Sequence, residues 1–120
     1  MAKFTHEFKG DFETWKLWII AYYRIKESQM ELIDRDDWEH EDVKVLHRQY
    51  QIFDLLVGDD VLIMTILLVG KGDTLRLSAT IPEDINFMPS RLLKKRERVV
   101  DEFKELFFEK LKTLGEVEDE

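Results

Sequence analysis

The chain contains no cysteine, and this absence removes several classes of function at once. No disulfide framework can form, and neither a thiolate metal site nor a thiol nucleophile is available. The first residues, MAKFTHEFKGDFE, include no apolar stretch flanked by small residues, so we expect no secretory signal. These absences together predict a cytoplasmic protein.

Long apolar runs and amide side chains are also scarce. The longest apolar run, residues 61–69 broken only by Thr65, is about half of what a membrane-spanning helix needs. We therefore expect no membrane association. A low content of amide residues beside abundant Glu, Lys and Arg is typical of thermophile proteins. This composition favours an archaeal or thermophilic organism, or a virus of one, as the source. The amide residues are Gln29, Gln49, Gln51 and Asn86.

What the chain does have is enough apolar material for one core. It has 120 residues, of which 44% are hydrophobic and 12% aromatic, and this excludes wholesale disorder. The length fits one domain and is too short for two separate cores. We expect a single α+β domain over residues 1–115, followed by an acidic tail, EVEDE, at residues 116–120.

The first third of the chain changes its periodicity at Gly10. Residues 3–9 alternate and predict a short strand. From Asp11, a plausible N-cap, apolar residues recur at spacings of three and four, which predicts an amphipathic helix as far as Ile25. The polar segment that follows, ESQMELIDRDDWEHED, is predicted to hold a turn between two helices.

A second helix is predicted over about residues 37–57, with Gly58 at the position where helices commonly stop. Its apolar residues are spaced by three and four, as in a two-heptad seam. They are Val43, Leu46, Tyr50, Phe53 and Val57.

The remaining elements are predicted to be a hairpin and a long helix. The runs VLIMTILLV and TLRLSATIP flank GKGD, the kind of turn that joins antiparallel strands. The first run is apolar on both faces, so we expect both of its faces to be buried. Pro82 ends the second strand, and residues 83–89 are predicted to form a loop. The final helix is expected to begin near Ser90 and to end near Leu114, with Gly115 closing it.

This order gives a short N-terminal strand, two helices, a β-hairpin and a long C-terminal helix. An isolated hairpin is marginally stable and needs cover, and the last helix is too long for a domain of this size. Both features favour a homodimer. We place its interface on the apolar stripe of the last helix, at Phe103, Phe107 and Leu111.

Charge is spread unevenly along the sequence. Residues 31–60 contain ten acids against three bases, whereas residues 91–98 contain five bases against one acid. A net charge of −8 argues against general nucleic-acid binding and suits a basic protein partner. Solvated surface is the alternative explanation for these runs, and pairing between the two runs is another. The candidate partner-binding residues are Asp34, Asp36, Asp37, Glu39, Glu41 and Asp42.

The segment RDDWEH places Arg35 and His40 with four residues between them. This spacing resembles the Arg-x4-6-His signature of HEPN-type ribonucleases, and the polar Asp36 after the arginine fits their pattern as well. The resemblance implies an all-helical fold and an RNA-cleaving site formed by two copies across a dimer. The acids in the same segment lack the order of an EF-hand loop, so we expect no metal and no cofactor.

No other catalytic pattern is present: GKGD lacks phosphate-loop spacing, and no serine or threonine lies in a nucleophile-elbow context. The leading hypothesis is a small non-enzymatic interaction protein, that is, an adaptor, regulator or inhibitor that works through an acidic surface. One alternative is an HEPN-like RNA-processing nuclease that uses Arg35 and His40. The other is a structural subunit of a larger complex.

Overall fold

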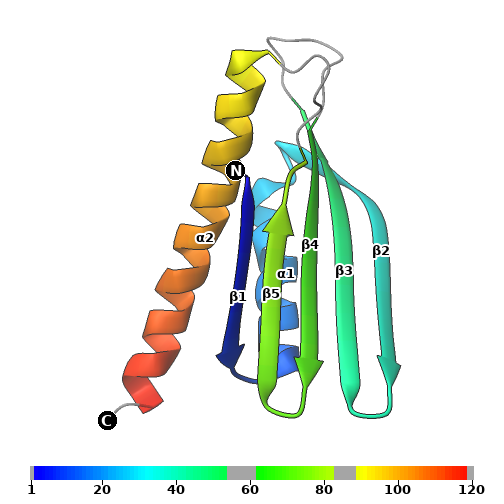
Figure 1. Ribbon diagram of the computed structural model, residues 1–120, viewed down its shortest axis with the longest axis vertical. Coiled ribbons are helices and arrows are strands. Elements are labelled where there is room, and N and C mark those ends of the chain that lie inside the picture. Colours follow the sequence, from blue (N-terminus) through cyan, green and yellow to red (C-terminus); the bar gives the residue numbers. More distant parts are fainter. Residues whose placement is uncertain (1, 54–61, 83–88, 119–120) are drawn as a thin grey trace.

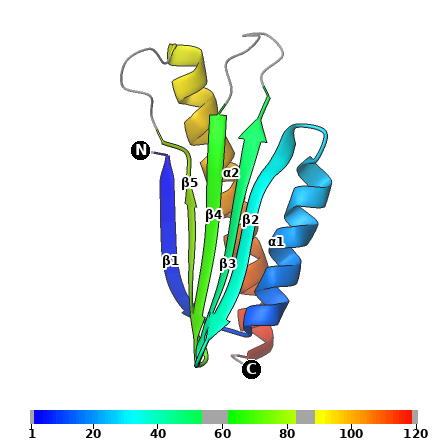
Figure 2. The same cartoon turned by 90° about the vertical axis from the view of Figure 1, so that its right-hand side faces the viewer.

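The computed structural model describes residues 2–53, 62–82 and 89–118, and in this part of the chain it shows an α+β fold. A five-stranded antiparallel sheet carries two helices, and both helices lie on the same side of it (Figures 1 and 2). The elements in chain order are β1 Lys3–Lys9, α1 Phe12–Lys26, β2 Met30–His40, β3 Val43–Ile52, β4 Leu62–Lys71, β5 Thr74–Thr80 and α2 Ser90–Glu118.

The strand order in the sheet is β1-β5-β4-β3-β2, so the first two strands of the sequence form the two edges. Helix α1 carries the chain from one edge to the other across the back of the sheet (Figure 1). Strands β2 to β5 then return strand by strand towards β1. This topology leaves β4 at the centre of the sheet and gives each edge its own set of side chains.

Several predictions from the sequence are confirmed. The N-terminal strand and the helix after it are present, and the Asp11 carboxylate accepts a hydrogen bond of 3.0 Å from the backbone N–H of Thr14. The hairpin is present as β4 and β5, with Gly72 in its turn at a φ of 63°, a value that suits glycine. The last helix begins at Ser90 and continues through Gly115, so glycine does not end it there.

The second predicted helix is wrong, and the residues before it contain a turn only at residues 27–29, after which a strand begins. Residues 30–40 and 43–52 form the antiparallel strands β2 and β3, joined at Glu41 and Asp42. Leu46 and Tyr50 satisfy a period of two as well as the helical spacing, and β3 buries them on one face together with Ile52. Partners on both sides of β3 complete its backbone hydrogen bonds, which local spacing does not reveal. Val57, Gly58 and the loop residues 83–88 lie outside the described residues.

The core lies between the sheet and the two helices, and aromatic rings fill much of it. The ring of Phe107 on α2 lies 5.0 Å from Phe8 of β1 and 5.0 Å from Trp15 of α1, measured between ring centroids. Phe107 and Trp15 are almost completely buried. Edge-to-face and tilted contacts of this kind stabilise a core beyond the area that they bury. Neither helix of the described chain is long and apolar enough to cross a membrane.

Candidate interaction surface

The acids predicted to bind a partner lie on edge strand β2 and on its turn, where alternate residues face opposite sides of the sheet. Asp34 and Asp36 lie on the side away from the helices, which we call the open face. Asp37 and Glu39 lie on the helix side. Glu41 and Asp42 form the turn into β3, and Glu41 has a φ of 55°, a left-handed conformation that is strained for a residue with a side chain. All six are exposed.

Asp37 is a structural residue rather than a free acid. Arg48 of β3, only 5% exposed, donates two hydrogen bonds to the Asp37 carboxylate, one of them 3.1 Å long from Nη2 to Oδ2. The Lys16 ammonium lies 3.8 Å from the same Oδ2. The hydrogen bond from Arg48 holds the pKa of Asp37 below its ordinary value, although partial burial opposes that shift. The pair therefore neutralises a buried guanidinium.

Arg35 and His40 do not meet. They are five residues apart on β2, which is about 17 Å along a strand, and their odd separation sends the two side chains to opposite faces. His40 is exposed at the end of the strand, where its Nε2 lies 3.9 Å from Glu41 Oε1. The five-stranded sheet also differs from the all-helical fold that the HEPN resemblance implies.

The open face has an apolar centre that neither helix covers (Figure 2). The register pairs Val45 with Val69 and His47 with Leu67, so these residues share that face on β3 and β4. Trp38 pairs with Val45 from the edge strand, and its side chain is 49% exposed. Leu67 and Val69 are half-buried and Val45 is 8% exposed, whereas Leu68 and Ile66 on the helix side are fully buried. The apolar residues of the open face are Trp38, Val43, Val45, Ile63, Leu67 and Val69.

The charges of the open face separate towards its two edges. On β2 the open face carries Glu31, Asp34 and Asp36, and the Asp34 carboxylate lies 4.0 Å from His47 Nδ1. On β1 it carries Lys3 and Lys9, together with Glu7, which pairs with Arg76 of β5 at 2.6 Å. One edge of the face is thus acidic and the other is basic, with apolar residues between them.

The outer edge of β2 is unsuited to pairing with another strand. The register of β2 against β3 shifts between Leu32 and Asp34, as in a β-bulge, and Ile33 is 46% exposed there. Bulges and charged side chains on an edge strand discourage edge-to-edge association. Contact with another molecule is therefore expected at the open face rather than along this edge.

The residues predicted for a dimer interface have other positions in the protomer. Phe103 and Phe107 are both 0% exposed and belong to the core between α2, β1 and α1. Leu111 is half-buried against the same core. An interface at these residues stays a prediction. Because two of the three side chains are already occupied within the protomer, the open face is the stronger candidate.

The basic cluster on α2 contacts backbone carbonyls at one end of the sheet. Arg96, 4% exposed, donates from Nε to the carbonyl of Ile81 at 2.7 Å, and Lys95 donates from Nζ to the carbonyl of Phe53 at 2.8 Å. Of the acids of β2, Asp37 has its partners on β3 and α1, and Asp34 lies near His47 of β3. The pairing of this cluster with acids of residues 31–42 in a second copy stays a prediction.

Sequence reasoning missed the open face because it assigned residues 43–52 to a helix. The available signal was β4, where VLIMTILLV does not alternate between apolar and polar residues. The sequence predicts both faces of that strand to be buried, whereas the protomer buries one face and leaves the other half-buried, in the pattern BiBiBiBiBe. Residues of one apolar strand therefore indicate a surface that the protomer does not cover.

Among residues 2–53, 62–82 and 89–118, no three side chains of Asp, Glu or His converge in a way that could hold a metal ion. Comparison of the chain with protein-family models finds no match, and comparison with curated proteins finds no similar sequence.

Proposed function

We propose that this protein is a non-enzymatic interaction protein that works as a homodimer, in which the open faces of two sheets pack together. The observation that carries the proposal is the apolar side of β4, where Ile63, Leu67 and Val69 have no helix over them. A strand with one solvated face normally alternates apolar and polar residues. On the open side of β4 these three apolar residues are interrupted only by Thr65 before Lys71 ends the strand, so a second layer is expected there.

The size of the open face fits a dimer interface. Strands lie about 4.8 Å apart, so five of them span roughly 20–24 Å, and seven to ten residues at about 3.3 Å each span roughly 23–33 Å. The footprint is on the order of 600 Å², before side-chain relief is added. Stable interfaces bury about 800 Å² from each partner, with an apolar centre and a polar rim.

The separated charges favour a second copy as the occupant and select one arrangement. A two-fold axis between the sheets, parallel to the strands, places the β2 edge of each protomer over the β1 edge of its partner. The register puts Asp34 in the same row across the sheet as Lys3, so the Asp34 carboxylate of each copy then approaches Lys3 of the other, which is favourable. An axis across the strands would place acid over acid. Packing with the strands of both sheets nearly aligned is also the common geometry of two-layer β structures.

Light scattering on the purified chain tests the proposal. We expect a particle of twice the 14.4 kDa chain mass at micromolar concentration. Leu67→Lys places a charge at the centre of the open face and is expected to give a folded monomer. Leu17→Lys is the matched control, because Leu17 is 65% exposed on α1, away from the open face, and its change should leave the dimer intact.

The same experiment separates the alternatives. A monomeric wild-type chain would contradict the proposal and would favour a structural subunit that needs other components to cover its open face. The nuclease alternative predicts metal-independent RNA cleavage that is lost in both Arg35→Ala and His40→Ala. The placement of these two residues on opposite faces of β2 does not support it.

Binding of a basic protein partner remains part of the proposal. In the proposed dimer the helices face outwards, and Glu39, Glu41 and Asp42 stay exposed at one end of each sheet. Acids at such a rim speed association with a positively charged surface and make it sensitive to salt.

A further inference from the structure

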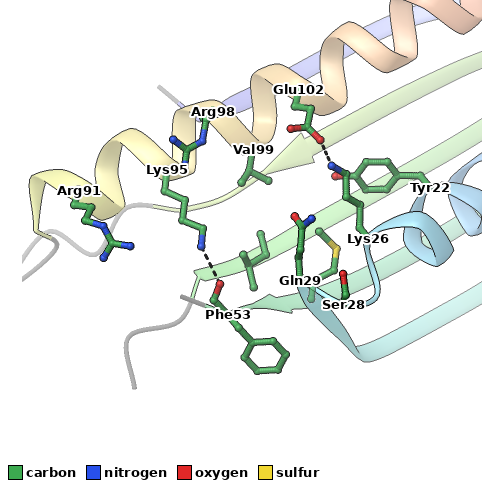
Figure 3. A pocket seen from close by; sticks show the side chains of 12 residues that line it. Tyr22, Lys26, Ser28, Gln29, Phe53, Arg91, Lys95, Arg98, Val99 and Glu102 are labelled. Carbon is green, nitrogen blue, oxygen red and sulfur yellow. Dashed lines mark hydrogen bonds and ion pairs between the residues drawn. The ribbon is translucent and has the colours of Figure 1, made fainter. Parts of the chain in front are cut away.

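A hollow of 460 Å³ lies on the helix side of the sheet, between the C-terminal end of α1 and the first half of α2. Met30 of β2, Ile52 of β3 and Val99 of α2 form its apolar part, and Figure 3 shows Val99 on α2 at its border. Met30 and Ile52 are each 3% exposed. The volume lies within the range of about 300–1,000 Å³ that is usual for small-molecule sites.

The charge lining this hollow is opposite in sign to that of the protein as a whole. Among the lining residues that the structure describes, four are basic and one is acidic, which gives +3, whereas the whole chain carries −8. The acidic residue in this count is Glu102, which pairs with Lys26 (Figure 3). Arg91, Lys95 and Arg98 come from successive turns of α2 on the side that faces the hollow. The bases are thus gathered around one opening rather than spread over the helix.

The position of these bases on α2 costs stability. The first turns of a helix favour acids, because the helix dipole is positive there, and α2 has no acid in its first turn. Bases placed near that end add to the positive potential instead of balancing it. The combined potential attracts an anion into the hollow.

One neutral donor also borders the hollow. Burial, and next the nearby Glu102 carboxylate, raise the pKa of the Tyr22 phenol, so this hydroxyl keeps its proton at neutral pH. Tyr22 is 4% exposed and lies beside Lys26 and Glu102 in the lining. A protonated phenol can donate a hydrogen bond to a bound oxygen.

We infer that this hollow binds an amphipathic anion, with its apolar chain against Met30, Ile52 and Val99 and its carboxylate or phosphate group beside Arg91 and Arg98. Charge-assisted hydrogen bonds from guanidinium groups suit both kinds of head group. The apolar floor and the basic mouth select together for a molecule that has both parts. This site is separate from the open face of the sheet.

Isothermal titration of the purified full chain with four probes tests the inference. Decanoate and decyl phosphate carry both parts, decanol lacks the charge, and inorganic phosphate lacks the chain. We expect binding of decanoate, decyl phosphate or both, and at least tenfold weaker binding of decanol and of inorganic phosphate. Whichever of decanoate and decyl phosphate binds more tightly identifies the preferred head group. Equal binding of decanol, equal binding of inorganic phosphate, or no binding of either amphipathic probe would overturn the inference.

Two variants locate the site. Arg98→Glu reverses a charge at the mouth and is expected to weaken the amphipathic probe by roughly ten- to a hundredfold. Lys104→Glu makes the same change on an exposed part of α2 that does not line the hollow, and should leave binding unchanged. Val99→Trp fills the apolar part and should abolish binding. If Arg98→Glu and Lys104→Glu bind alike and Val99→Trp still binds, the probe occupies another place and the inference is wrong.

Discussion

The two faces of the sheet are made from alternate residues of the same strands, yet they differ in how they are used. The helix-side face carries Leu68, Leu77 and Ile66, all fully buried beneath α1 and α2. The open face carries Leu67 and Val69, which are equally apolar and only half-buried. One face therefore stabilises the protomer, whereas the other retains apolar area that the protomer does not bury completely.

Truncation of a core aromatic residue should give the largest effect on stability. Phe107→Ala removes a ring that contacts both α1 and β1, and we expect it to lower the free energy of unfolding by about 3–5 kcal/mol. Phe108→Ala is the matched control, since Phe108 is the next residue and is 37% exposed. Urea denaturation measures the free energy of unfolding of both variants. Equal losses in the two variants would mean that the core is not centred on Phe107.

Asp37 and Asp34 offer a smaller contrast between the two faces. Asp37→Asn leaves the Arg48 guanidinium without its carboxylate, and we expect a loss of about 1–2 kcal/mol at neutral pH, the low end because Asp37 is 38% exposed. Asp34→Asn on the open face should cost less than about 0.5 kcal/mol when measured on the protomer. Urea denaturation at low protein concentration compares the free energies of unfolding of the two variants.

The pH dependence of Asp37 has a defined sign. The folded protein holds the pKa of Asp37 below its ordinary value of 3.8, so unfolding raises that pKa. The unfolded chain therefore binds more protons as the pH falls below about 4, and the stability from the pair is lost there. Wild type should lose more stability than Asp37→Asn between pH 5 and pH 3. Parallel curves for the two proteins would show that the pair does not stabilise the fold.

Sequence patterns predicted the elements whose signals are local. The Asp11 cap, the periodicity of α1 and the glycine-containing turn of β4 and β5 each depend on neighbouring residues, and each is present. Strand β3 was missed because Leu46 and Tyr50 fit two periods, and only pairing with β2 and β4 decides between them. The acids of β2 were identified, but their division between two faces follows from register. For the same reason, the pairing of Asp37 with Arg48 could not be predicted.

The measurement that most directly tests the central claim is the mass of charge-swapped proteins by light scattering. Asp34 and Lys3 lie in one row of the sheet, so each faces the other residue of the partner copy in the proposed dimer. We expect Asp34→Lys alone and Lys3→Glu alone each to weaken the dimer by at least tenfold, and the two changes together to restore it, because opposite charges meet again. A dimer that neither change affects, or one that the combination does not restore, would contradict the account.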